Sequence, residues 1–174
     1  MKDEHLQFSF ASSTDITSIN VLVNSAYRGD SSKRGWTTEA DLLDGIRTDE
    51  EGLKSMLAKP SSVIIQVREE KELVGCVYLE KQEAKMYLGM LTVAPNLQAR
   101  GIGKALLQKA EEYALQQKCT SIIMTVITRR SELIAWYERH GYSDTGERKP
   151  FPADPGFGLQ KIPLEFLVLE KPLR

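Results

Sequence analysis

Residues that support metal chemistry or disulfide frameworks are scarce in this sequence. Its 174 residues include two cysteines and two histidines. Cys76 and Cys119 stand inside apolar runs without CxxC spacing, which is typical of buried free thiols and gives no reason to expect an oxidising compartment. Since His5 and His140 are the only imidazoles, a histidine-rich metal site is excluded and a Ser/His/Asp hydrolase is disfavoured. We expect no bound metal.

An excess of charge of one sign and long apolar runs are also missing. The 23 Lys and Arg residues nearly balance the 24 Asp and Glu residues, giving a formal net charge of −1, so nothing directs the chain to nucleic acid. No apolar run approaches the roughly 20 residues of a membrane span, and the first residues, MKDEHLQF, lack the apolar core of a signal peptide. We expect a cytoplasmic protein that binds neither nucleic acid nor membrane.

A chain of this length and composition is expected to fold as one globular unit. With 41% hydrophobic and 27% charged residues, it can bury roughly 70% of its unfolded surface. Neither an internal repeat nor a linker-like change of composition divides the sequence, so we expect a single domain over residues 1–174.

Periodicity in the apolar residues predicts an alternation of helices and strands. The helices are expected at 16–26, 38–46, 49–59, 102–114 and 131–140. The strands are expected at 6–11, 62–68, 73–81, 84–93, 121–126, 142–147 and 164–170. Turn-forming residues separate these segments, and the last two strands are joined by a loop at 149–163 that is rich in Pro and Gly.

The order of these segments predicts a mixed α/β sheet. Short charged turns join the three strands between 62 and 93, which is typical of an antiparallel meander. The third strand is apolar on both faces, with Met86, Leu88, Met90 and Thr92 expected on one side, so it is placed in the middle of the sheet. A helix then leads to the strand at 121–126, and this order predicts a right-handed crossover between parallel strands.

The segment 98–104, with sequence QARGIGK, connects that central strand to the long helix. Glycines allow close approach to helix N–H groups that lack partners, and Arg100 and Lys104 add positive charge, so we expect a pyrophosphate to bind here. The dinucleotide fingerprint is excluded because Leu106 replaces its third glycine, and a P-loop because glycine at 98 and Ser or Thr at 105 are missing. By itself, a GxG before a helix is equally typical of a tight turn.

Two motifs give a more specific interpretation of the segment 98–104. The run LTV at 91–93, Pro95 and the spacing Q-x-x-G-x-G at 98–103 before a helix resemble the acyl-CoA signature Q/R-x-x-G-x-G/A of the GNAT superfamily of N-acyltransferases. The segment 133–142, LIAWYERHGY, resembles the aromatic-Tyr-x-x-x-Gly-aromatic helix end of the same superfamily. Together with the order of strands and helices, the resemblance covers nearly the whole chain.

The resemblance implies an α/β (α+β) fold of the GNAT type: a largely antiparallel sheet, flanked by helices, whose central parallel strands at 86–93 and 121–126 splay apart. Acetyl-CoA, as co-substrate, would lie in that cleft, with its pantetheine arm on the central strand and its pyrophosphate on the glycine loop. A main-chain N–H near Leu91 would polarise the thioester carbonyl. The residues implied to bind the coenzyme are Leu91, Thr92, Val93, Gln98, Ala99, Arg100, Gly101, Ile102, Gly103 and Lys104.

The same resemblance implies direct attack of an amine on the thioester in a ternary complex, without a covalent enzyme intermediate. Tyr137 is the expected proton donor to the leaving thiolate, because a phenol with a pKa of about 10 stays neutral at neutral pH. The alternative is that Tyr137 merely packs beside Trp136. The central strand has no carboxylate to act as a base, so a water relay or a base from elsewhere is expected. Glu39, Asp41 and Glu80 stay open as candidates, with capping or surface roles as alternatives for the first two.

Acceptor binding is expected at the first helices and the loop before the last strand. Tyr27, Trp36 and Glu39 are the candidate substrate residues, although packing at the core or its rim explains the two aromatics equally well. Arg129 and Arg130 offer cations for an acceptor carboxylate or the coenzyme 3′-phosphate; a solvated basic turn is the alternative.

These observations predict an N-acetyltransferase that acts on a primary amine of a small molecule or peptide, with acetyl-CoA as co-substrate. An acyl-CoA sensor or interaction module without turnover is the alternative, and other acyl chains such as propionyl or succinyl stay open. The exposed edge of the 142–170 hairpin can pair with a second copy, so a homodimer is an open expectation as well.

Overall fold

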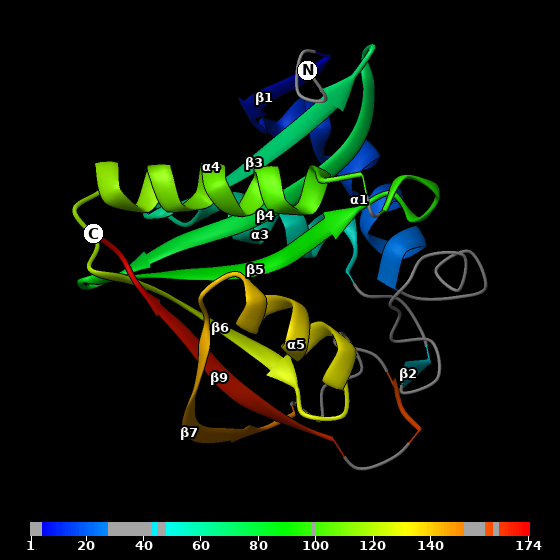
Figure 1. Ribbon diagram of the computed structural model, residues 1–174. Helices are drawn as coiled ribbons and strands as arrows, with labels where there is room; N and C mark the ends of the chain where they lie inside the picture. Colours follow the sequence, from blue (N-terminus) through cyan, green and yellow to red (C-terminus); the bar gives the residue numbers. More distant parts are fainter. Residues whose placement is uncertain (1–4, 28–42, 45–47, 99, 152–158, 162–163) are drawn as a thin grey trace.

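The computed structural model describes residues 5–27, 43–44, 48–98, 100–151, 159–161 and 164–174 (Figure 1). Its helices are α1 (Ile16–Tyr27), α3 (Glu50–Ala58), α4 (Ile102–Gln116) and α5 (Ser131–Arg139), with 3-10 turns at Ser13–Asp15 and Pro95–Leu97. Its strands are β1 (Leu6–Phe10), β2 (Leu43–Asp44), β3 (Ser62–Glu69), β4 (Glu72–Gln82), β5 (Lys85–Val93), β6 (Ser121–Ile127), β7 (Ser143–Pro150), β8 (Leu159–Gln160) and β9 (Glu165–Pro172). Among the described residues, no helix is long and apolar enough to cross a membrane.

Seven strands form a mixed sheet in the order β1-β3-β4-β5-β6-β9-β7. Every neighbouring pair is antiparallel except β5 with β6, which run parallel on either side of the α4 crossover. The predicted α/β class, the antiparallel meander and the central position of β5 are therefore confirmed. The parallel pair is in register only from Lys85–Ser121 to Tyr87–Ile123, and beyond this point the two strands diverge (Figure 1).

Helices cover both faces of the sheet and divide its core into two clusters. Helix α4 buries Leu106, Leu107 and Ala110 against one face, where α5 also packs, because its apolar residues recur at helical spacing. Helices α1 and α3 cover the other face, with Ile19 and Leu53 fully buried. The sheet is thus fixed from both sides at the point where β5 leaves β6.

Strand β5 contains a bulge at Met90, whose φ of +56° lies in the left-handed region. On β4, Cys76 pairs with Thr92 of β5, and Tyr78 pairs with Gly89 of β5. One residue therefore separates the two paired positions on β4, whereas two residues separate them on β5. Such an extra residue bends a strand and leaves local backbone groups without ladder partners. Met90 and Leu91 therefore stand outside the regular pairing between the two strands.

The bulge reverses the alternation of side chains that the sequence predicts. Met86 and Leu88 lie in the core cluster on the sheet face that α4 covers, but Met90 packs in the cluster on the face that α1 and α3 cover. Leu91 joins the face of Met86 and Leu88 instead. The prediction that Met90 and Thr92 share a face with Met86 is wrong beyond Gly89, because the extra residue shifts the period-two pattern by one position.

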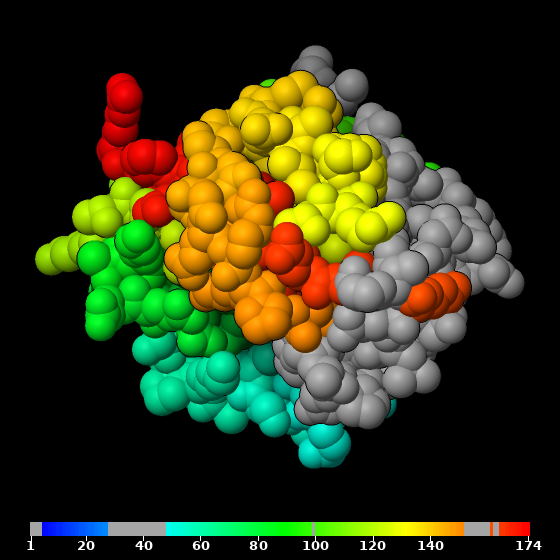
Figure 2. All heavy atoms as spheres, turned by 90° about the horizontal axis from the view of Figure 1, so that it is seen from below, coloured from blue at the N-terminus to red at the C-terminus, as the bar shows by residue number. Residues whose placement is uncertain are grey.

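Two other segments differ from the predicted elements. At positions 43–44, where a helix was expected, β2 pairs antiparallel with β8, so long-range pairing overrides the local helical pattern. Strand β7 extends to Pro150, beyond the expected end at 147, because it continues to pair with β9. All eight residues of β7 are exposed, and its orange atoms lie at the surface in Figure 2.

Candidate active site

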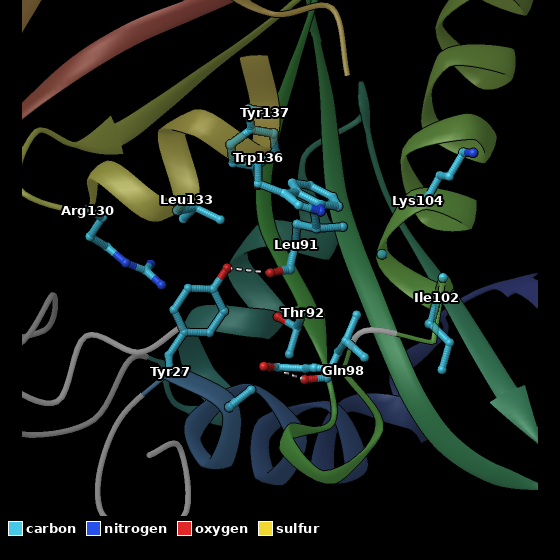
Figure 3. A pocket seen from close by; sticks show the side chains of 14 residues that line it. Tyr27, Leu91, Thr92, Gln98, Ile102, Lys104, Arg130, Leu133, Trp136 and Tyr137 are labelled. Carbon is cyan, nitrogen blue, oxygen red and sulfur yellow. Dashed lines mark hydrogen bonds between the residues drawn. The ribbon is translucent and has the colours of Figure 1, made fainter. Parts of the chain in front are cut away.

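A groove opens where β5 separates from β6, between the N-terminus of α4 and helix α5 (Figure 3). We call it the α4 groove. Its lining residues are Ala26, Tyr27, Leu91, Thr92, Val93, Gln98, Gly101, Ile102, Gly103, Lys104, Arg130, Leu133, Trp136 and Tyr137. Eight of the ten residues predicted to bind a coenzyme are among them, together with the predicted acid Tyr137.

The first turn of α4 presents unpaired N–H groups to this groove. The first helical hydrogen bond runs from the Ala105 N–H to the Gly101 carbonyl at 3.0 Å, so the three preceding amides have no partner within the helix. Gly101 adopts a φ of +86°, which favours glycine, and no acidic residue occupies the first turn. With the positive end of the helix dipole added, this turn is suited to an anion.

Gly103 faces the Trp136 ring of α5. A Cβ built on Gly103 would lie 3.5 Å from that ring, which is ordinary contact distance. On the adjoining loop, Gln98 Nε2 donates to the Val93 carbonyl at 3.2 Å. Gln98 thus ties the loop to the end of β5 as well as lining the groove.

Of the two cations predicted beside the glycine loop, Lys104 lines the groove. Arg100 instead lies against Glu69 at the end of β3, with 3.1 Å between Nη2 and Oε2, and does not line it. Ala99 is outside the described residues, and so are the predicted substrate residues Trp36 and Glu39.

A second hollow, the β5–β6 cleft, lies between the diverging strands and is lined on β5 by residues from Tyr87 to Leu91. Its lining is mostly apolar and aromatic. The lining residues are Tyr27, Tyr87, Leu88, Gly89, Met90, Leu91, Met124, Thr125, Val126, Ile127, Arg130, Leu133, Tyr137, Phe151 and Phe166. Among these described lining residues, Arg130 carries the only charge.

The α4 groove and the β5–β6 cleft meet at five shared residues: Tyr27, Leu91, Arg130, Leu133 and Tyr137. At this junction the Tyr27 hydroxyl donates to the Leu91 carbonyl at 2.5 Å (Figure 3). The Arg130 guanidinium lies 5.9 Å from the centre of the Tyr27 ring. Side chains from α1, β5 and α5 therefore converge on the bulge.

Tyr137 is 5% exposed at this junction. Burial is the largest influence on its hydroxyl and raises the pKa of Tyr137 well above the ordinary value of 10, while Arg130 opposes the rise. The ring makes edge contacts with Trp136 at 5.1 Å and Tyr142 at 5.8 Å between centres. Tyr137 therefore packs in the core and also faces both hollows as a neutral phenol.

Of the three carboxylates considered as bases, only Glu80 is among the described residues, and it is not at the junction. Glu80 accepts a hydrogen bond from the Tyr78 hydroxyl at 2.5 Å, which lowers the pKa of Glu80, and also pairs with Lys59 at 3.1 Å. It lines neither hollow. Asp41, like Glu39, lies outside the described residues. Within the part of the chain that is described, no cluster of His, Cys, Asp and Glu could hold a metal ion.

Sequence comparisons identify relatives of this chain. The model of the acetyltransferase (GNAT) family matches residues 30–142. A curated protein from Azospirillum brasilense, named IAA acetyltransferase, is 25% identical over 101 residues, which are 57% of this chain and 66% of that protein. The aligned region thus spans just under two thirds of that relative's length.

Solved structures share the fold at low sequence identity. The ribosomal-protein-S18-alanine N-acetyltransferase of Escherichia coli has a TM-score of 0.72 and 14% identity, covering 97% of this chain and 94% of that one. Ard1 of Thermoplasma volcanium has a TM-score of 0.73 and 15% identity, covering 98% and 99%. Nourseothricin acetyltransferase has a TM-score of 0.71 and 16% identity, with the same coverage. These similarities concern the fold alone.

Proposed function

The chain belongs to the acetyltransferase (GNAT) family, and from this we propose that it transfers the acetyl group of acetyl-CoA to a primary amine of a small molecule or peptide. One observation carries the proposal. The α4 groove and the β5–β6 cleft meet at Tyr27, Leu91, Arg130, Leu133 and Tyr137. A thioester that follows the groove and an amine that enters through the cleft would meet there.

The groove supplies the groups that a coenzyme A molecule requires. Its pyrophosphate would accept hydrogen bonds from the free amides of Ile102, Gly103 and Lys104, with the Lys104 ammonium nearby. Beyond Tyr87 the edge of β5 is no longer paired with β6, so its backbone is available to hydrogen-bond the amides of the pantetheine arm, as an added strand would.

The proposed reaction is a direct acyl transfer. The amine nitrogen attacks the thioester carbonyl carbon, so that a C–N bond forms and the C–S bond breaks. A main-chain N–H at the Met90–Leu91 bulge would stabilise the oxyanion. The amine releases a proton to water, Tyr137 donates a proton to the departing thiolate, and water returns a proton to Tyr137. A cysteine nucleophile is not used, because Cys76 and Cys119 are buried and line neither hollow.

The raised pKa of Tyr137 is compatible with a proton donor. The same desolvation that disfavours a phenolate disfavours a thiolate placed beside it, so the pKa of the leaving thiol rises in the same direction. The pKa values of the Tyr137 phenol and of the leaving thiol thus stay matched at the buried junction, and Tyr137 enters each turnover protonated.

We expect the pH profile of kcat to have no descending limb below about pH 10. An acid is active below its pKa and is lost as the pH rises through that value, and burial moves the pKa of Tyr137 well above 10. The rate should rise as the amine loses its proton and then level off. Initial rates at saturating substrates between pH 6 and pH 10 provide the measurement; a fall centred near pH 8 would contradict a buried tyrosine as the acid.

Thiol release from acetyl-CoA tests the proposed function. Release should accelerate when amino acids, polyamines, aminoglycosides or peptides are added singly, and the accelerating amine should be recovered with one acetyl group. Coenzyme binding by calorimetry, measured in parallel, reports on the groove alone. Binding without acceleration by any amine would make the protein an acyl-CoA-binding module and would contradict transfer.

A further inference from the structure

Tyr87 stands at the point where the two parallel strands separate. It is the last residue of β5 that pairs with β6, opposite Ile123, and it lines the β5–β6 cleft. Its side chain is half-buried, and its hydroxyl makes no hydrogen bond to any residue that the structure describes. A phenol can both donate and accept a hydrogen bond. Tyr87 therefore presents a hydroxyl that a molecule in the cleft can use.

Neighbouring residues determine where the Tyr87 ring lies. A Cβ built on Gly89 would be 3.1 Å from Cε1 and 3.3 Å from the hydroxyl oxygen of Tyr87, so the ring lies over Gly89, the residue next to the bulge. A side chain at position 89 would push the ring away. The Tyr78 ring of β4 meets that of Tyr87 edge-on, with 6.5 Å between centres, and Tyr78 is itself held by its hydrogen bond to Glu80. The Tyr87 hydroxyl is thus held beside the bulge.

Tyr87 and Tyr137 approach the cleft from opposite faces of the sheet. Tyr87 packs with the core cluster under α1 and α3, whereas Tyr137 belongs to the cluster under α4 and α5. Burial chiefly raises the pKa of Tyr137 and the Tyr87 hydroxyl adds to the rise, so the two groups are close enough to interact. In the tetrahedral intermediate, nitrogen and sulfur occupy different corners of one carbon. One hydroxyl is therefore available to each of them.

A phenol oxygen is suited to hold an attacking amine. It accepts a hydrogen bond from an N–H group, and this leaves the lone pair of the nitrogen free to attack the thioester. A phenol is uncharged at neutral pH, so it does not stabilise the ammonium form of the amine as a carboxylate would. The neutral amine is the form that attacks.

The rest of the described lining suits an apolar group on that amine. Met90, Met124 and Val126 line the cleft, and so do the rings of Phe151 and Phe166, whose centres are 5.0 Å apart. Contact with these side chains removes apolar surface of a ligand from water, which favours binding of an alkyl or aryl group. The cleft is therefore expected to select the acceptor by the hydrophobicity of the part beyond its nitrogen.

We infer that the acceptor is a primary amine on an apolar alkyl or aryl group, and that the Tyr87 hydroxyl binds its nitrogen beside the bulge. The amine N–H donates to the phenol oxygen of Tyr87, while Tyr137 serves the sulfur from the other face of the sheet. This inference rests on the proposed function, because it assigns the substrate class and a further catalytic residue of the same site.

Binding of 2-phenylethylamine and ethylamine, which differ only by the phenyl ring, tests the inference on the protein saturated with coenzyme A. Calorimetry should show that 2-phenylethylamine binds at least about 10-fold more tightly. Tyr87→Phe should weaken both amines by the same factor, about 3-fold to 10-fold, because each loses a hydrogen bond to its nitrogen. The preference for the phenyl ring should be retained, and coenzyme A affinity should stay within about twofold.

Tyr78→Phe is the matched control. It removes the hydroxyl of the neighbouring ring, which lines neither hollow, and should leave the affinity for both amines within about twofold. Gly89→Ala displaces the Tyr87 ring without removing its hydroxyl, so it should also weaken both amines. Added to Tyr87→Phe, it should cause little further loss, because the hydroxyl that it displaces is already missing.

The outcomes separate this inference from the proposed function. Equal binding of the two amines by the unmodified protein, or binding of neither, would overturn the inference. A Tyr87→Phe variant that binds both amines normally, or that weakens 2-phenylethylamine alone, would overturn the contact with nitrogen. Acetyl transfer to the two amines with equal kcat/KM would overturn the inference and leave the proposed function standing. Tyr87-dependent binding of 2-phenylethylamine without thiol release would do the reverse. The comparison of the two amines on the unmodified protein holds even where a variant fails to fold.

Discussion

Replacing Tyr137 by phenylalanine is expected to lower kcat by about 100-fold to 10,000-fold, which is the range for loss of a general acid. Coenzyme A affinity should stay within about twofold, because the ring and its contacts with Trp136 and Tyr142 are retained. Single-turnover mixing of the enzyme with acetyl-CoA and an accepted amine measures the chemical step, and calorimetry measures the affinity.

Tyr142→Phe is the matched control for this prediction. Tyr142 is also buried and its ring lies 5.8 Å from that of Tyr137, but it lines neither hollow. The Tyr142→Phe variant, which lacks this hydroxyl, should have a kcat within about twofold of that of the unmodified protein. If both variants slow the chemical step equally, the effect comes from packing in the aromatic cluster and Tyr137 is not the acid.

Gly103→Asp is expected to weaken coenzyme A binding by at least about 100-fold. Two unit charges 4 Å apart interact by about 4 kcal/mol at an effective dielectric constant of about 20, and about 1.4 kcal/mol corresponds to a tenfold change in affinity. An aspartate in the first turn of α4 would place its carboxylate where the pyrophosphate is proposed to bind. The Cβ itself is tolerated, because its nearest neighbour, the Trp136 ring, is 3.5 Å away.

Gly103→Asn isolates the charge, since asparagine has the shape of aspartate without its carboxylate. Relative to that control, Gly103→Asp should raise the free energy of unfolding by about 0.3–1 kcal/mol through the helix dipole. Stability and coenzyme affinity should thus move in opposite directions, as measured by urea unfolding and calorimetry. Equal coenzyme affinity in the two variants would show that the first turn of α4 does not hold the phosphates.

Local motifs in the sequence were sufficient to predict which helices and strands form the site. The spacing of Gln98, Gly101 and Gly103 before a helical period identified the start of α4, and the strand order identified the parallel pair. Both depend on residues close together in the chain. The structure accordingly brings Lys104 and Tyr137 to one groove, as their positions in the two motifs suggested.

Features that depend on distant partners were not predictable in the same way. The bulge at Met90 exists through the pairing of β5 with β4, and the only local sign of it in the run KMYLGMLTV is the isolated glycine at position 89. Arg100 and Lys104 are both basic, but Glu69, which comes 31 positions earlier in the chain, accepts hydrogen bonds from Arg100. The hydrogen bond from Tyr27 to Leu91 likewise joins α1 to β5 across 64 positions.

The packing of Arg130 on Tyr27 also depends on residues that are far apart in the chain. The sequence shows two adjacent arginines and leaves a solvated turn as an alternative for both. Helix α5 begins at Ser131, and the turn before it buries Arg130 at the junction while Arg129 stays exposed. A difference of one position decides which arginine faces the hollows, and only the packing of α5 on the sheet sets that position.

Direct transfer at the junction is tested most directly by following an isotope-labelled acetyl group by mass spectrometry. The protein is incubated with labelled acetyl-CoA, first alone and then with an amine that accelerates thiol release. The account predicts an intact protein of unchanged mass in both samples and one labelled acetyl group on each amine for each thiol released. A labelled acetyl group on the protein that later moves to the amine, or thiol release without an acetylated amine, would contradict it.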